Sequence, residues 1–226
     1  QWYVDRNLYI KTSNICIETN EIANKDKTFA CCLSSTNAYY FDEWENHPNF
    51  MFDMNLMLDC VIEDYIEKGS KLPGLEKAVR FAKEHRSIGL GILAFCSFLQ
   101  KKGIIFGEIA SYAVNKRIFS KLRSESDRAS IWMAKHFGEP EMLKGYGYRN
   151  TTRLAQAPTK STSYIMGGET LNLSEGVEPH KSNYTSKKLA KIQSEVKNKE
   201  LVDLLETKGK NTKEVWSCIL THNGSV

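Results

Sequence analysis

Long helical segments alternate with short extended segments along this chain, and this alternation is what most limits its possible folds. Over residues 3–40, short apolar runs rich in β-branched and aromatic residues predict extended segments around a polar loop. Over residues 54–68, apolar residues recur every three or four positions and predict a helix, which Gly69 and Pro73 then end.

The same pattern continues to the end of the chain. Further helices are predicted over residues 75–85, 88–101, 107–136 and 186–206, and a second extended region over residues 152–166. The apolar stripe of the longest helix includes Ile109, Tyr112, Ile118, Leu122, Trp132 and Met133. Strands separated by long helices predict an α/β architecture, and 226 residues are enough for one large domain or two small ones.

Charge and cysteine content exclude several classes of protein. A net charge of +4 among 226 residues is mild, so nothing demands a nucleic-acid partner. The apolar run IGLGILAFCSFL is shorter than the roughly 18 residues that a membrane span needs, so we expect a soluble protein. Six cysteines without a CxxC pair or zinc-finger spacing argue against a metal site or a disulfide scaffold, and favour the reducing cytoplasm.

The stretch SNICIE sets Asn14, Cys16 and Glu18 at alternate positions, with Ile15 and Ile17 between them. In an extended segment the three polar side chains would share one face and the two isoleucines would be buried behind it. A cysteine on an apolar strand is usually a small buried hydrophobe. Burying an amide and a carboxylate beside it is costly without partners, so a pocket for a polar ligand explains this pattern better.

The stretch TFACCLSSTN places two adjacent cysteines, Cys31 and Cys32, in another extended run. Adjacent residues of an extended chain point to opposite faces, so only one of them can face the same cavity as Cys16. Two nearby thiols can supply two electrons by forming a disulfide, whereas simple packing is the alternative. The residues alone do not choose between these interpretations.

The stretch APTKSTSYIMGG presents hydroxyl groups in a turn that Pro158 helps to fix. They belong to Thr159, Ser161, Thr162 and Ser163. Hydroxyls and backbone amides in a loop, or in the first turn of a helix, can bind a phosphate without a glycine-rich loop. A Ser/Thr-rich surface loop is the alternative interpretation.

Read in order, these segments resemble the large, catalytic subunit of class I ribonucleotide reductase. SNICIE is similar to the family's SNLCxE finger loop, CCLSSTN to its CxLSxxN strand, and HRSIGLG to the start of its R-x-[IL]-G-[IL]-G helix. RNTTRLAQAPTKSTS followed by SEGVEP is similar to its RN-x-T…APT-x-S-x-S and NGIEP elements. The resemblance implies part of a ten-stranded α/β barrel with a finger loop that carries the radical cysteine, and thus a single, partial barrel domain over residues 1–226.

The resemblance also implies roles for individual residues. Cys16 would be the thiyl-radical residue that takes the 3′ hydrogen of the substrate ribose, Glu18 the base for the 3′ hydroxyl, and Asn14 the amide that orients it. Cys31 would be the redox cysteine and Cys32 a packing residue. The substrate-binding residues would be Ser13, Thr159, Lys160, Ser161, Thr162 and Ser163, with Lys160 either near the diphosphate or facing solvent.

The activity implied is reduction of ribonucleoside diphosphates to 2′-deoxyribonucleoside diphosphates, which supplies DNA replication. No metal or cofactor is expected on this chain, because the radical would come from a metal-containing small subunit and the electrons from a thioredoxin- or glutaredoxin-type dithiol. The family's other redox cysteine would precede Gln1, and its tyrosine pair would follow Val226. We therefore expect a fragment that needs the remaining segments of the large subunit and is inactive alone.

Two other interpretations stay open. The chain could be a non-catalytic α/β module that binds a nucleotide or a partner, which loss of Cys16 or Glu18 would have favoured. A thiol-redox protein that uses Cys31 and Cys32 as a pair is a poorer alternative, because vicinal cysteines form a strained ring.

Overall fold

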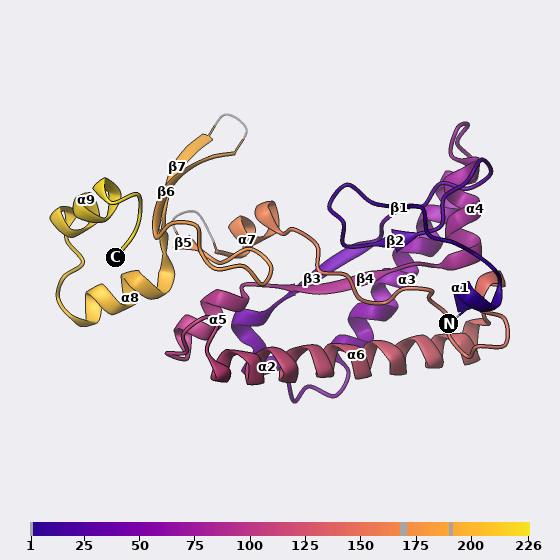
Figure 1. The fold of residues 1–226 in the computed structure, drawn as a ribbon, viewed down its shortest axis with the longest axis horizontal. Helices are drawn as coiled ribbons and strands as arrows, with labels where there is room; N and C mark the ends of the chain where they lie inside the picture. The colour runs from indigo at the N-terminus through magenta and orange to yellow at the C-terminus, as the bar shows by residue number, and fades with distance from the viewer. Residues whose placement is uncertain (1, 168–170, 190–191) are drawn as a thin grey trace. The chain divides into compact units, whose positions relative to one another are not determined.

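The computed structural model describes residues 2–167, 171–189 and 192–226, and its elements are traced in Figure 1. The chain forms two compact units. The first contains Gln1–Thr36, Asp42–Gly91 and Lys116–Ala157, and the second contains Asn37–Phe41, Ile92–Asn115 and Pro158–Val226. Our expectation of a single domain over residues 1–226 stays a prediction.

The first unit opens with a short helix, α1 (Trp2–Asp5), and a small antiparallel hairpin, coloured indigo in Figure 1. The hairpin consists of β1 (Thr12–Ser13) and β2 (Asn20–Glu21), with Thr12 opposite Glu21 and Ser13 opposite Asn20. A longer strand follows, β3 (Leu33–Asn37). The extended segments predicted for this part of the chain are therefore present, although they are short.

Three helices follow: α2 (Phe41–Trp44), α3 (Phe50–Gly69) and α4 (Glu76–His85). The predicted helices over 54–68 and 75–85 are confirmed. Helix α3 buries a stripe at helical spacing, which consists of Met51, Leu58, Ile62 and Ile66. Helix α4 ends where Arg86 adopts a left-handed conformation, with φ of 46°, and turns the chain toward the next strand.

Residues 88–101 do not form the single helix that we predicted. They form a strand, β4 (Gly89–Leu93), and a helix, α5 (Phe95–Lys101). Strand β4 pairs with β3, and Leu90 forms a parallel bridge with Leu154. All five of its residues are buried, and a short apolar run that is buried on every side shows no alternation from which a strand can be recognised.

The longest helix is α6 (Ile109–Phe137), close to the predicted 107–136. Its buried residues include Ile118, Leu122 and Met133. Ile109 and Tyr112, which we placed in the apolar stripe, are exposed. A short 3-10 turn, η2 (Glu141–Leu143), follows in the first unit.

The second unit includes a 3-10 turn, η1 (Ala38–Tyr40), and a helix, α7 (Lys160–Gly167). The extended region predicted over 152–166 is therefore wrong from Lys160 onward, and its predicted end at Gly168 lies outside the described residues. Part of the unit's core consists of Tyr39, Leu93, Ala94 and Leu173.

A three-stranded sheet replaces most of the helix predicted over residues 186–206. Its strands are β5 (Leu171–Asn172), β6 (Tyr184–Leu189) and β7 (Ile192–Asn198), in the order β5-β7-β6. Strands β6 and β7 are antiparallel from the pair Tyr184–Lys197 to the pair Leu189–Ile192, and β5 is parallel to β7. Residues 190 and 191 lie outside the described part of the chain.

Two helices end the second unit, α8 (Lys199–Thr207) and α9 (Lys213–Thr221). Each begins at a polar cap: the Asn198 side chain accepts from the amide of Glu200, and Thr212 from that of Val215. Only the last part of the predicted 186–206 helix is therefore helical.

Candidate active site

From Asn14 onward, the residues of SNICIE form the turn between β1 and β2 rather than an extended strand. Asn14 and Thr19 close this turn. The Asn14 amide donates to the Thr19 carbonyl, and the Thr19 amide donates to Oδ1 of Asn14, each at 3.2 Å. The amide of Ile17 donates to the carbonyl of Asn14 (3.1 Å), and Ile17 has a left-handed φ of 66°. We call residues 14–19 the Cys16 loop.

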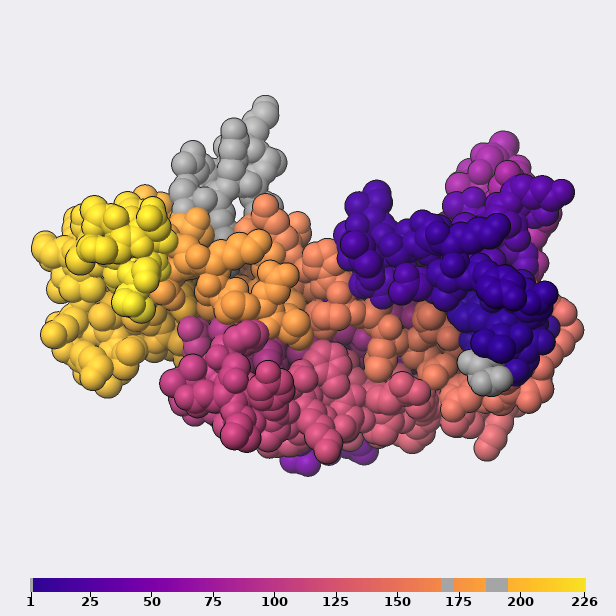
Figure 2. Space-filling view, viewed as in Figure 1, coloured from indigo at the N-terminus to yellow at the C-terminus, as the bar shows by residue number. Residues whose placement is uncertain are grey.

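This turn corrects the geometry that alternation predicted. Ile15 and Ile17 are 99% and 73% exposed, so they are not buried behind the polar residues. The reason is local: the side chain of Asn14 accepts a backbone hydrogen bond inside the turn, and strand alternation stops where the turn begins. Cys16 is exposed on this loop, within the indigo N-terminal residues that lie at the surface in Figure 2.

Two polar groups of the Cys16 loop have no hydrogen-bond partner among the described residues. One is Oε2 of Glu18, which is buried although the residue is only half-buried. The other is the Nδ2 group of Asn14, whose Oδ1 is occupied by the amide of Thr19. A buried carboxylate oxygen without a partner is costly, so it marks a position where a bound hydroxyl would be stabilising.

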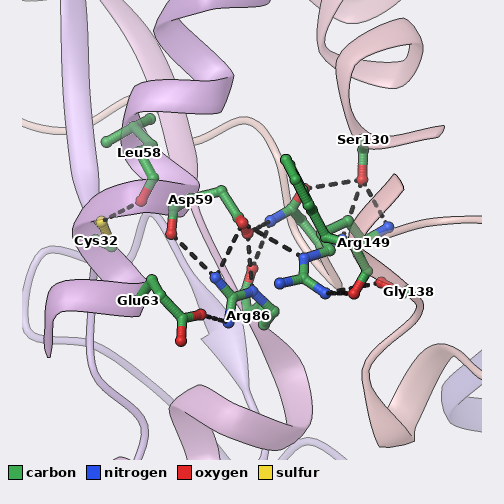
Figure 3. A network of polar contacts seen from close by, with 10 residues as sticks. Cys32, Leu58, Asp59, Glu63, Arg86, Ser130, Gly138 and Arg149 are labelled. Carbon is green, nitrogen blue, oxygen red and sulfur yellow. Dashed lines mark hydrogen bonds and ion pairs between the residues drawn. The ribbon is translucent and has the colours of Figure 1, made fainter. Parts of the chain in front are cut away.

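Cys31 and Cys32 point to different neighbours, as expected for adjacent residues of an extended chain. The Cys31 thiol is exposed and lies 3.7 Å from the Thr19 hydroxyl of the Cys16 loop. The Cys32 thiol donates to the carbonyl of Leu58 in α3 at 3.6 Å (Figure 3). Burial, helped by the charge of Asp59, raises the pKa of Cys32 to about 11. Of the two thiols, Cys31 is thus the one beside the Cys16 loop.

A cavity of about 380 Å³ lies beside these cysteines in the first unit. Its wall is mainly apolar, and it includes Cys31, Cys32, Met57, Leu58, Val61 and Phe81. Cys32 therefore lies between a helix and an apolar cavity, which suits a packing residue more than a reactive one.

In the second unit, the hydroxyl-rich stretch begins α7. The Thr159 hydroxyl accepts from the amide of Gly176 (2.8 Å), and the Ser163 hydroxyl donates to the carbonyl of Lys160 (2.9 Å). Thr159 and Ser163 are buried, whereas Lys160 and Ser161 are exposed and Thr162 is half-exposed. The first turn of a helix has unpaired amides, so the groups open to a phosphate are these amides with Ser161, Thr162 and Lys160.

Known proteins are similar to this chain in sequence and in fold. The family model described as the ribonucleotide reductase barrel domain matches residues 2–143 and 139–226. The chain belongs to this family.

Relatives of this chain include two viral proteins. It is 38% identical over 213 residues to the ribonucleoside-diphosphate reductase large subunit of Invertebrate iridescent virus 6, covering 93% of this chain and 22% of that protein. It is 34% identical over 229 residues to the same subunit of Invertebrate iridescent virus 3, covering 100% and 35%. The chain thus spans about a fifth to a third of the length of these relatives.

A solved structure gives the same result for the fold. The class Id ribonucleotide reductase alpha subunit of Actinobacillus ureae is similar with a TM-score of 0.90 and 43% sequence identity, over 100% of this chain and 40% of that one. The predicted family and the predicted class of fold, part of the α/β reductase barrel, are confirmed. The roles of Asn14, Cys16, Glu18, Cys31, Ser13 and the residues of α7 stay predictions.

The sequence interpretation missed a buried carboxylate, Glu21, in strand β2. Glu21 is 1% exposed and accepts hydrogen bonds from the hydroxyls of Tyr3 (2.7 Å), Ser87 (2.5 Å) and Thr152 (3.1 Å). Burial raises the pKa of Glu21, while these hydroxyls act in the opposite direction. Little in the sequence indicated this role: Glu21 lies two residues after the Cys16 loop, and its position opposite Thr12 is seen only in the structure.

Two further properties concern the part of the chain that the structure describes. Within it, no group of three His, Cys, Asp or Glu side chains is placed to bind a metal ion. None of the helices described is long and apolar enough to cross a membrane.

Proposed function

We propose that this chain is the part of a ribonucleoside-diphosphate reductase that carries the radical cysteine, the base and the diphosphate-binding turn. The observation that supports this proposal best is the Cys16 loop in a member of the reductase family. Within six residues it has an exposed thiol, a buried carboxylate oxygen and an amide group, and neither of the last two has a partner among the described residues.

The first step of the proposed reaction takes place at the 3′ carbon of the ribose. Cys16, as a thiyl radical, takes the 3′ hydrogen atom and becomes a thiol. Oε2 of Glu18 accepts the proton of the 3′ hydroxyl, while the Nδ2 group of Asn14 donates to that oxygen and orients it. One loop then supplies the radical, the base and the orienting amide, and Ser13 adjoins it.

The second step removes the 2′ hydroxyl. The Cys31 thiol gives a proton to this group, which leaves as water, and Cys31 with a second thiol from another segment of the large subunit supplies two electrons and ends as a disulfide. Cys16 then returns its hydrogen atom to the 3′ carbon. A thioredoxin- or glutaredoxin-type dithiol reduces the disulfide for the next turnover.

The diphosphate is proposed to bind at the first turn of α7. Ser161 and Thr162 offer hydroxyls that the helix does not use, and the amides of this turn carry the positive end of the helix dipole. Lys160 is exposed at the same turn and adds a positive charge. Thr159 and Ser163 support the turn through their own hydrogen bonds to Gly176 and Lys160.

Several partners follow from this proposal. A metal-containing small subunit supplies the radical, so no metal on this chain is required, and other segments of the large subunit complete the barrel. The chemistry needs reduced thiols at rest, which suits the cytoplasm.

The test is reduction of a ribonucleoside diphosphate by the assembled enzyme that contains these 226 residues, with the small subunit and a dithiol. Cys16→Ala is the main variant, and Cys60→Ala, at another exposed cysteine, is its matched control. We expect turnover with Cys60→Ala and none with Cys16→Ala. Equal turnover by the two variants would refute the catalytic role and leave a module that only binds a nucleotide or a partner.

A further inference from the structure

The Cys16 loop has little support from its own hairpin. Strands β1 and β2 form only two residue pairs, Thr12 with Glu21 and Ser13 with Asn20. A two-stranded hairpin is marginally stable by itself even when it is longer. The position of Cys16 must therefore depend on contacts between this hairpin and the rest of the first unit.

The carboxylate of Glu21 makes the best-defined of these contacts. Its Oε2 accepts from Tyr3 of α1, and its Oε1 accepts from Ser87 and Thr152, which come from two other segments of the first unit. The Thr152 hydroxyl also lies 2.5 Å from the Ser87 hydroxyl and 3.0 Å from the carbonyl of Ile88. We call Glu21, Tyr3, Ser87 and Thr152 the Glu21 cluster.

The Glu21 cluster is attached to β4 and to the segment that runs beside β4. Ser87 stands just before β4, and the Ile88 amide donates to the carbonyl of Thr152 at 3.2 Å. The next residue pair, Leu90 and Leu154, continues this contact as a parallel bridge. A carboxylate that is held by this ladder can fix the strand that leaves the Cys16 loop.

The Glu21 carboxylate offers an acceptor oxygen to each side of the cluster, Oε2 to Tyr3 and Oε1 to Ser87. Tyr3, Ser87 and Thr152 each bring one hydroxyl hydrogen, and the carboxylate oxygens of Glu21 and the Ile88 carbonyl can accept all of them. An amide at position 21 would offer one acceptor oxygen in place of two, so one of the hydroxyl hydrogens that Glu21 accepts would lose its acceptor. The cluster is thus specific for a carboxylate and not only for its shape.

We propose that Glu21 is a positioning residue of the reductase. Through Tyr3, Ser87 and Thr152 it holds the Cys16 loop in the position from which Cys16 can reach the substrate. The connection is short, because Thr19, which closes the loop with Asn14 and contacts the Cys31 thiol, is two residues before Glu21. This inference rests on the proposed function, in which Cys16 must reach one ribose carbon.

The experiment compares Glu21→Gln with Glu67→Gln, which makes the same change at an exposed carboxylate of α3 that is paired with Lys71. A second pair is Thr152→Val, which removes the hydroxyl at nearly constant shape, and Thr152→Ser, which keeps it. All four are made in the assembled enzyme. The measurements are kcat, KM for the ribonucleoside diphosphate, the thermal midpoint, and the alkylation rate of Cys16 relative to Cys60.

We expect Glu21→Gln and Thr152→Val to lower kcat about 10- to 100-fold, because small displacements of a reacting group cost this much. Their KM should stay close to that of the unchanged enzyme, since the diphosphate binds elsewhere. The alkylation ratio of Cys16 to Cys60 should change in the same two variants. Thr152→Ser and Glu67→Gln should keep both kcat and this ratio.

The proposal is wrong if Glu21→Gln and Thr152→Val keep kcat and the alkylation ratio. It is also wrong if they lose activity only in step with the thermal midpoint while the ratio stays constant, because Glu21 would then serve stability alone. Thr152→Val keeps the test available if Glu21→Gln does not fold. Cys16→Ala distinguishes a failure of the proposed function from a failure of this inference. Turnover that survives Cys16→Ala refutes the proposed function. The alkylation ratio, measured in the Glu21 and Thr152 variants, which keep Cys16, still tests the position of the loop.

Discussion

Arg86 donates two hydrogen bonds to the carboxylate of Asp59, from Nε to Oδ1 and from Nη2 to Oδ2, each 2.9 Å long (Figure 3). Both residues are buried, and Asn150 donates a further hydrogen bond to Oδ1 of Asp59 at 2.9 Å. Burial lowers the pKa of Arg86, but Asp59 and Glu63 together raise it above its ordinary value. The pair joins α3 to the left-handed turn at the end of α4.

Removing one charge of this pair should be costly. We expect Asp59→Asn to lower the free energy of unfolding by about 3–5 kcal/mol, because Arg86 would lose its buried counter-charge and keep only Glu63, whose side chain is largely exposed. The control is Asp64→Asn, which breaks an exposed pair with Lys68 and should cost about 0–1 kcal/mol. Urea unfolding followed by circular dichroism measures both. A loss as small as that of the control would show that Arg86 finds another partner.

Gly91 in β4 leaves no space for a side chain. A Cβ atom there would lie 2.4 Å from the carbonyl oxygen of Ala155, which belongs to the backbone and cannot move away alone. Gly91→Ala should therefore lower the free energy of unfolding by about 1–3 kcal/mol. In Gly69→Ala the new Cβ meets a side-chain atom of Val79 instead, at 2.9 Å, and replacing a helical glycine compensates, so a smaller loss is expected. Equal losses in urea unfolding would contradict this explanation.

The sequence predicted the long helices well because their signal is local. In α3 the buried residues Leu58, Ile62 and Ile66 recur at spacings that only a helix brings to one face. Strand β4 has no such signal, since it is buried on every side. The close approach of the Ala155 backbone at Gly91, and of the Ala155 and Leu33 side chains at Gly89, explains why two glycines lie in it, but this reason depends on residues far away in the sequence.

The β6–β7 hairpin shows a second limit of local patterns. Its Lys- and Glu-rich sequence is typical of an exposed helix, and we predicted one. The strands are defined instead by pairing with each other and by the parallel contact of β7 with β5, from Leu171 opposite Lys197 to Asn172 opposite Asn198. Pairing partners of this kind are not visible in a window of one segment.

The candidate site was also predicted only in part. The motifs identified the Cys16 loop, but alternation gave it the wrong geometry, because the Asn14–Thr19 turn replaces the strand. Glu21 was missed since a glutamate in a short polar strand resembles a surface residue. Its partners Ser87 and Thr152 are 66 and 131 residues away, so their convergence is a property of the fold alone.

Cys32 should react slowly with alkylating agents. Only the thiolate is nucleophilic, and burial raises the pKa of Cys32 to about 11, so little thiolate exists at pH 8. We expect iodoacetamide to modify Cys60, which is exposed, well before Cys32. The rate at Cys32 should still rise with pH between pH 8 and pH 10. Peptide mapping by mass spectrometry measures both rates, and similar rates at pH 8 would mean that the thiol is not held in this environment.

The same position gives a prediction about turnover. If Cys32 only packs against Leu58 and the neighbouring cavity, Cys32→Ala should keep reductase activity in the assembled enzyme. Cys31→Ala should abolish turnover with a dithiol, because the proposed reaction needs that thiol as an electron donor. The reverse result would assign the redox role to Cys32 and would contradict the alignment of CCLSSTN with the family motif.

His85 should make stability depend on pH. Its ring is buried, stacks on Phe81 at 4.2 Å and lies edge-on to Trp2, and neither nitrogen has a hydrogen-bond partner among the described residues. Burial, with the charge of Lys27, lowers the pKa of His85 from 6.5 to about 3. Between these values the unfolded chain binds a proton that the folded chain does not. The contribution of the buried, neutral His85 to stability is therefore complete above pH 6.5 and is lost as the pH falls toward 3.

We expect His85→Phe, which keeps an aromatic ring in an apolar site, to flatten the decline of the urea midpoint between pH 7 and pH 4. Carboxylates contribute equally to both proteins, so parallel curves would show that His85 becomes protonated within the fold.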